Sequence, residues 1–201
     1  NVIITNNRIK RYFGLNTLEV KQAMIDKKKA KNLSIIALDK TQLWYLVNQI
    51  YTHYKTIEDQ WKPTFYYVRV KAIKSIFFLL VLNALVFYTE MLNVWFVNAL
   101  GTLIVLAYLK ITYRKAYYSL DDQYLVVGSG FIETKTEIME MHKIQSVVLV
   151  QSYFMKRRNV ASVYVYTASG KISVAYIEYE RAKSILNHLL YHVETCGKNW
   201  M

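Results

Sequence analysis

The sequence predicts an α+β fold in which small antiparallel β-sheets, each closed by a helix, lie next to a pair of transmembrane helices. An apolar stretch at 75–109 carries a single formal charge, Glu90. Strand-like alternation with turn signals follows at 117–177, and a shorter strand-and-helix pattern precedes it at 2–54. The expected segments are half of a β-domain at 1–56, a linker at 57–69, a helical hairpin at 70–113, a complete β-domain at 114–196 and a tail at 197–201.

The apolar stretch predicts the helical hairpin. A bilayer core requires about 20 mostly apolar helical residues, and a first helix from Val70 reaches that length if Lys71 and Lys74 extend to the interface. A charged Glu90 at mid-membrane would cost about 3 kcal/mol. The chain is therefore expected to turn at 89–93 and to return as a second helix to Tyr113. The alternative is a buried helical hairpin in a soluble core.

Cations flank the hairpin on both sides, whereas the expected turn at 89–93 contains no Lys or Arg. The positive-inside rule then places both helix ends in the cytoplasm. This predicts a multi-pass protein of the cell membrane whose other domains face the cytoplasm. The membrane-flanking residues would be Arg69, Lys71, Lys74, Lys110, Arg114 and Lys115.

The composition limits which partners the chain can bind and which kinds of site it can form. The 201 residues carry a formal net charge of +12. Next to a membrane, this basic excess favours anionic lipid headgroups over nucleic acid as the partner. The single cysteine, Cys196, excludes an internal disulfide and a thiolate metal site. Because the chain begins with Asn1, it is interpreted as a piece of a longer protein with upstream domains.

An internal repeat relates the two ends of the chain. Val2–Val20 aligns without a gap on Val147–Val165, and both copies predict strand, basic connection, strand, turn, strand and helix. The first copy has a longer loop that contains Lys27, Lys28, Lys29 and Lys31, and lacks the strands expected upstream of the second copy. It is interpreted as the back half of a domain whose front half is absent. The alternative is two β–α segments that are similar by chance.

The second copy carries a family resemblance. YYSLDDQYLVVGSGFI, MHKIQSVVLVQSYFMKRRNVASVYVYTASGKISVAYI and ERAKSILNHLL follow one another from Tyr117 to Leu190. This order resembles the bacterial PH-like membrane-flanked family, the YdbS/YdbT-like group. The resemblance implies a PH-like antiparallel β-barrel or sandwich capped by a C-terminal helix, with a truncated copy at Val2–Tyr54. It also implies the C-terminal part of a multi-domain member. Asn159 stands where that family often has a glycine.

The residues indicate no catalytic site, so we expect no enzyme and no cofactor. His188 and His192 are one helical turn apart and could hold a metal, but further ligands would have to come from Glu194 or Cys196. A solvated helix face is the preferred interpretation, and no metal is expected. Asp121 and Asp122 are interpreted as a turn, as is Gly128–Gly130, which lacks the pattern of a phosphate loop.

The basic connections are the candidate contact site. Lys10 and Arg11 in the first copy match the position of Lys156, Arg157 and Arg158 in the second. Each cation near an anionic surface contributes about 1 kcal/mol, and Phe154 with Met155 could insert as wedges. The alternative is a solvated charge run that keeps a strand end soluble.

The function expected from these features is an integral membrane scaffold. It would present cytoplasmic PH-like domains to anionic lipid or to a partner protein, without catalysis and without nucleic acid. The alternative is an accessory subunit of an envelope transport, peptide-export or resistance system, whose hairpin packs against membrane proteins. Asn83, Asn98 and Gly101 could supply that contact, and a homo-oligomer is also open.

Overall fold

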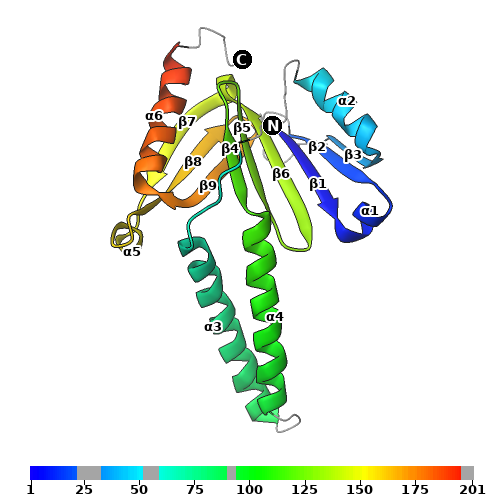
Figure 1. The fold of residues 1–201 in the computed structure, drawn as a ribbon, viewed down its shortest axis with the longest axis vertical. Coiled ribbons are helices and arrows are strands. Elements are labelled where there is room, and N and C mark those ends of the chain that lie inside the picture. Colours follow the sequence, from blue (N-terminus) through cyan, green and yellow to red (C-terminus); the bar gives the residue numbers. More distant parts are fainter. Residues whose placement is uncertain (22–32, 52–58, 90–93, 196–201) are drawn as a thin grey trace.

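The structure, a computed structural model, describes residues 1–21, 33–51, 59–89 and 94–195. The strands gather at one end of the molecule, and two long helices extend away from them at the other (Figure 1). The lysine-rich loop, Glu90 and Cys196 lie outside the described residues.

The element bounds follow the alternation and the helical spacing of the sequence. The strands are β1 (Val2–Asn7), β2 (Asn16–Val20), β3 (Leu33–Leu38), β4 (Tyr117–Leu120), β5 (Tyr124–Gly130), β6 (Glu133–Glu140), β7 (Ile144–Val150), β8 (Val160–Thr167) and β9 (Gly170–Glu178). The helices are α1 (Arg8–Tyr12), α2 (Lys40–Ile50), α3 (Tyr66–Thr89), α4 (Val94–Lys115), α5 (Tyr153–Lys156) and α6 (Tyr179–Thr195), with a 3₁₀ turn at Met141–Lys143. The turn expected at Gly128–Gly130 is wrong, because β5 continues through Gly130.

The strands form two antiparallel sheets, which confirms the α+β prediction. The larger sheet has the order β3-β2-β1-β6-β5-β4, and the smaller has the order β7-β8-β9. Strand β1 pairs with β6 in the register Val2–Ile138. The N-terminal segment therefore continues the sheet that the strands of 117–140 begin, and it does not form a sheet of its own.

Two hydrophobic cores lie on opposite faces of β5 and β6. Leu125 and Met139 belong to the core that β7–β9 and α6 close. Val126 and Ile138, their neighbours in the sequence, belong to the core that β1–β3 and α2 close. Because successive side chains of a strand point to opposite faces, one pair of strands serves both cores.

The two repeat segments share their order of elements and a local backbone detail. In each segment a short helix joins the first two strands, α1 between β1 and β2 and α5 between β7 and β8. Gly14 (φ +70°) and Asn159 (φ +52°) are both left-handed. The amide of Gly14 donates to the Arg11 carbonyl, and the amide of Asn159 donates to the Lys156 carbonyl, both at 3.1 Å. Asn is one of the residues that tolerate this conformation, which explains how it replaces glycine here.

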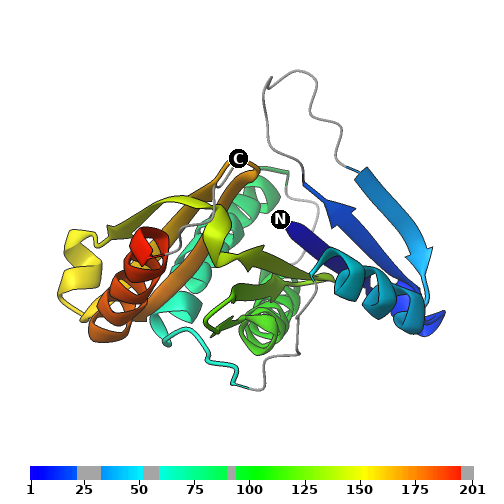
Figure 2. The ribbon, with the colours of Figure 1, turned by 90° about the horizontal axis from the view of Figure 1, so that it is seen from above.

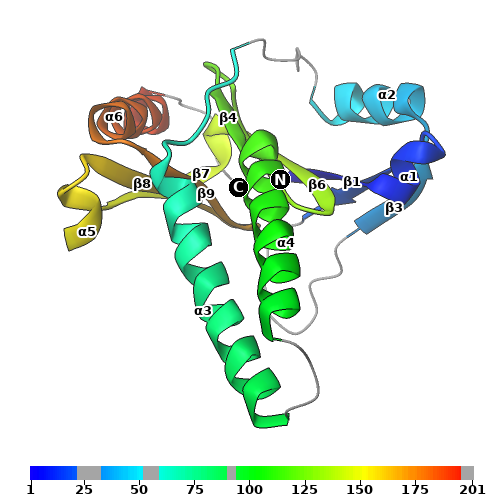
Figure 3. The same cartoon turned by 60° about the horizontal axis from the view of Figure 1, so that its bottom comes forward.

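The helices α3 and α4 lie side by side and run in opposite directions (Figure 3). The amides of Asn83 and Asn98 join them by reciprocal hydrogen bonds of 3.0 and 2.8 Å. Within the part of the chain that the structure describes, no helix combines the length and the apolarity needed to cross a membrane.

The transmembrane hairpin predicted at 70–113 is therefore wrong, and so is the multi-pass cell-membrane location with cytoplasmic domains derived from it. The reason is the polar content of the two helices. Lys74 lies in α3, Lys110 lies in α4, and the paired Asn83 and Asn98 interrupt the apolar run between them. Neither run reaches the roughly 20 apolar residues that a bilayer core requires.

Candidate functional site

The connection between β7 and β8 is a short, firmly held turn. Ser152 caps α5, because its hydroxyl accepts a hydrogen bond from the Met155 amide at 3.4 Å. The Gln151 side chain donates to the Val160 carbonyl at 3.0 Å and closes the base of the turn. Met155 is buried with 6% of its surface exposed, so it fixes α5 to the body of the protein.

The other side chains of this turn point outward. Tyr153 and Phe154 are 71% and 69% exposed, and their rings meet edge to face at 5.8 Å. Lys156, Arg157 and Arg158 are exposed directly after them. Of the two predicted wedges, the structure exposes Phe154 and buries Met155. Large exposed aromatic rings next to cations are typical of surfaces that contact a charged interface.

The start of α3 extends this surface. Arg158 lines a hollow of about 360 Å³ together with Arg69 and Phe65, and α5 lies beside the first turn of α3 in both side views (Figures 1 and 3). The structure thus brings together a predicted contact residue and a predicted membrane-flanking residue. We call the group the basic–aromatic surface; it consists of Phe65, Arg69, Tyr153, Phe154, Lys156, Arg157 and Arg158.

The position of α3 next to β9 depends on Tyr176. This residue has a φ of +57°, and its carbonyl accepts hydrogen bonds from the amide of Thr64 at 2.8 Å and from its hydroxyl at 2.6 Å. Burial raises the pKa of the Tyr176 hydroxyl above its usual value, so the ring stays neutral. The charge of the adjoining hollow comes from Arg69, Arg158 and the carboxylate of Glu178.

The first basic connection lies elsewhere. Helices α5 and α1 occupy opposite ends of the molecule, with α3 and α4 between them (Figure 2). Lys10 is half-buried, and its ammonium group donates to the Thr17 hydroxyl at 2.7 Å. Arg11 is exposed and is followed by Tyr12 and Phe13, which are 87% and 66% exposed. The structure therefore does not bring Lys10 and Arg11 together with the cations of α5.

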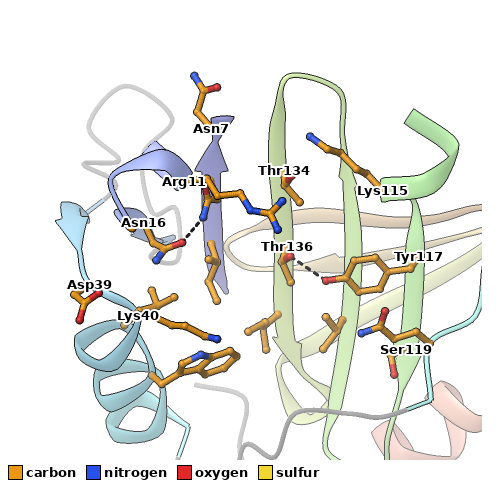
Figure 4. A pocket seen from close by; sticks show the side chains of 18 of the residues that line it. Asn7, Arg11, Asn16, Asp39, Lys40, Lys115, Tyr117, Ser119, Thr134 and Thr136 are labelled. Atoms are coloured by element: carbon orange, nitrogen blue, oxygen red, sulfur yellow. Dashed lines mark hydrogen bonds between the residues drawn. The ribbon is translucent and has the colours of Figure 1, made fainter. Parts of the chain in front are cut away.

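Arg11 belongs instead to a pocket of about 760 Å³ between α2 and the larger sheet. Arg11 and Lys40 extend into it from the side of α1 and α2 (Figure 4). Lys115 also lines it, and its ammonium group donates to the Phe131 carbonyl at 2.7 Å. The pocket floor is apolar and is formed by Ile4, Leu43, Trp44, Val126 and Ile138.

Polar groups surround the same pocket. The hydroxyls of Tyr117 and Thr136 are 3.0 Å apart, and the Asn6 amide donates to the Asn16 side chain at 2.6 Å (Figure 4). The Asn6 Oδ1 atom is buried and has no hydrogen-bond donor within the described residues. Cations together with an unused acceptor suit an anionic ligand that also carries a hydroxyl or amide donor.

The remaining membrane-flanking residues lie along the two long helices. Lys71 is half-buried and lies 5.6 Å from the centre of the Tyr67 ring. Lys74, Lys110 and Arg114 are exposed. None of these four residues lines either the hollow beside α5 or the pocket under α2.

Residues 72–193 match the family described as Bacterial PH domain. The chain belongs to this family. The match begins inside α3 and ends inside α6, so it includes α4 and β4–β9. No curated protein and no solved structure matches the chain. PH domains are in general binding modules without catalysis, and they bind lipids or proteins. The resemblance to a bacterial PH-like family is thereby confirmed, and with it a general binding role.

Sequence reasoning did not include Tyr153 and Phe65 in the contact site. Tyr153 is next to Phe154, which it did include, whereas Phe65 lies in the predicted linker, four residues before Arg69. Their roles depend on exposure, because an aromatic residue in a connection can be either a core residue or a surface residue. Only the packing of Met155 shows that Tyr153 and Phe154 point outward.

Proposed function

We propose that this bacterial PH domain protein is a non-catalytic module that docks on anionic lipid surfaces through the basic–aromatic surface. One observation carries the proposal: Tyr153 and Phe154 are exposed beside Lys156, Arg157 and Arg158 on a turn that Met155 and Ser152 hold in place. The docking is peripheral, from the aqueous side of the lipid headgroups.

The chemistry of the surface favours lipid over an uncharged partner. The cations attract anionic headgroups at about 1 kcal/mol each. The two rings have an apolar body and, in Tyr153, a polar tip, which is the combination that suits the boundary between headgroups and acyl chains. Because the turn is already ordered, docking costs little conformational entropy.

Replacing Lys156, Arg157 and Arg158 together by Ala is expected to weaken vesicle binding of the full chain roughly 100-fold, from about 3 kcal/mol of lost attraction. Binding is measured by co-sedimentation with vesicles that contain phosphatidylglycerol and with vesicles of phosphatidylcholine alone. Wild type should bind the anionic vesicles only, and added salt should weaken binding because it screens the cations. Tyr153→Ala with Phe154→Ala should also weaken binding, but should leave the salt dependence unchanged.

The matched control removes three cations elsewhere, as Lys135→Ala, Lys171→Ala and Lys183→Ala in one chain. It should bind anionic vesicles almost as wild type does, since the proposal rests on position and not on net charge. Equal losses in the two triple variants would contradict the proposal. Absence of binding to either vesicle would also contradict it and would favour a protein as the partner.

The pocket under α2 supports a second candidate, capture of a single phosphorylated headgroup. The specific observation is that Arg11, Lys40 and Lys115 line one pocket, which also contains the buried Asn6 Oδ1 atom. Glycerol 3-phosphate is expected to bind the full chain, and Arg11→Ala with Lys40→Ala should weaken this binding at least about 10-fold. Isothermal titration measures it, with the Lys183→Ala chain as the control. Unchanged binding in the double variant would contradict this role.

The family membership extends to a finer proposal about domain organisation. We propose that the chain is the C-terminal part of a multi-domain protein of the YdbS/YdbT-like group, with half a PH-like domain at 1–56, a linker at 57–69 and a complete PH-like domain at 114–196. The equivalent left-handed positions at Gly14 and Asn159 support it, because they occupy the same place in the two copies.

A further inference from the structure

Two histidines of α6 and one aspartate from a distant turn form a cluster that the binding role does not use. His188 and His192 are one turn apart on α6, and Asp122 lies in the turn that joins β4 to β5. This turn and the C-terminal part of α6 both lie at the end of the molecule opposite the tips of α3 and α4 (Figure 1). The cluster is thus brought together only by the packing of α6.

The donor atoms of the three side chains converge. Asp122 Oδ1 lies 3.9 Å from Nε2 of His188 and 3.9 Å from Nε2 of His192, and one donor atom from each of the three residues lies within 4.8 Å of the others. The two imidazole rings are 4.6 Å apart between centroids. In a tetrahedral zinc site with bonds of about 2.0–2.2 Å, neighbouring donors are about 3.3–3.6 Å apart. Small side-chain rotations therefore suffice to close the cluster around an ion.

The surroundings hold the cluster in place but leave it accessible. The imidazoles of His188 and His192 are 33% and 24% exposed, whereas the Asp122 carboxylate is 82% exposed. Between the two histidines, Leu189 is fully buried and fixes this face of α6 against the core. The Asp122 amide donates to the Asp121 side chain at 2.9 Å, which orders the turn. An ion bound here would keep one or more positions for water on the solvent side.

We propose that His188, His192 and Asp122 form a binding site for a divalent transition metal, with Zn²⁺ as the best match. Two imidazoles and one carboxylate suit zinc, whereas Mg²⁺ and Ca²⁺ prefer oxygen ligands alone. The bound ion would join α6 to the β4–β5 turn and would stabilise the C-terminal part of this helix. The site is independent of lipid docking, because none of its residues belongs to the basic–aromatic surface.

The test uses the full chain, produced without a polyhistidine tag and treated with a chelator. Isothermal titration with Zn²⁺ should give one ion per chain. His188→Ala, His192→Ala and Asp122→Asn should each weaken binding at least about 10-fold, since even the loss of a residue that only supports a ligand costs about 10–100-fold. Co²⁺ should give visible absorption bands that these variants lose. Zn²⁺ should also raise the Tm of wild type, and should not raise it in the variants.

Two controls separate this site from other donors. His142→Ala removes a histidine beside Glu140, outside the cluster, and Cys196→Ser removes the thiol; both should bind Zn²⁺ as wild type does. Without metal, all variants should have the Tm and circular dichroism of wild type, because the three side chains are partly exposed. Loss of binding in Cys196→Ser, unchanged binding in Asp122→Asn, or no binding by wild type would each overturn the proposal.

Discussion

Replacing Ile138 by Ala is expected to lower the free energy of unfolding by about 2–5 kcal/mol. The Ile138 side chain is fully buried in the core between the larger sheet and α2. Its carbonyl accepts a hydrogen bond from the Tyr51 hydroxyl at 3.2 Å, which the substitution preserves, so the loss comes from packing. Urea unfolding followed by far-ultraviolet circular dichroism measures the effect.

Met139→Ala tests the other face of the same strand. Met139 is also fully buried, but it belongs to the core closed by β7–β9 and α6, and we expect a loss of the same size. Because both residues lie on β6, both substitutions should shift one common unfolding transition. Two separate unfolding transitions, each shifted by only one of the substitutions, would contradict the inference that β6 joins the two cores into one unit. Val148→Ala on β7, where the side chain is 43% exposed, should change stability by no more than about 0.5 kcal/mol.

Gly130→Ala is expected to destabilise the protein strongly, because two separate costs add at this position. Gly130 has a φ of +132°, and a Cβ there would overlap the Glu133 carbonyl. The obstacle is backbone and cannot move aside without opening the turn between β5 and β6. A conformation that only glycine adopts readily costs an L-residue about 1–3 kcal/mol, and the overlap adds to that cost.

Gly170→Ala is the matched control for this prediction. Gly170 has nearly the same φ, +135°, but a Cβ there would meet no atom within 4 Å. The difference in stability between Gly130→Ala and Gly170→Ala therefore isolates the overlap from the backbone conformation. Equal losses in the two variants, measured by thermal and urea unfolding, would show that the β5–β6 turn relaxes freely.

The β5–β6 turn also affects the pocket under α2. The Phe131 carbonyl accepts the hydrogen bond from Lys115 at 2.7 Å, and the Phe131 ring packs on Tyr108 of α4 at 4.8 Å. Displacement of this turn would release Lys115 from its place at the pocket and would loosen α4 from the sheet. A Gly130→Ala chain that still folds should therefore bind glycerol 3-phosphate more weakly than the Gly170→Ala chain does.

The sequence by itself determined the local elements. The alternation with turn signals at 117–177 predicted a series of strands, and β4–β9 lie there, since side-chain alternation is a property of one strand. The family is confirmed as well, because its signature is a linear order of such elements.

The apolar stretch shows where local reasoning failed. It predicted two helices correctly, and α3 and α4 are there, but the inference that they cross a membrane is wrong. An apolar stretch of sequence indicates only that its side chains are more stable away from water. The described helices carry cations and the Asn83–Asn98 pair, and their apolar runs are too short for a bilayer core.

Only the tertiary structure decided which distant residues meet. Any strand edge offers the same backbone donors and acceptors, so the sequence could not show that β1 pairs with β6. The approach of Arg158 to Arg69, and of Asp122 to His188 and His192, depends on how helices pack against the sheets. The sequence supplied the chemistry of both candidate sites, whereas packing determined which of these side chains act together.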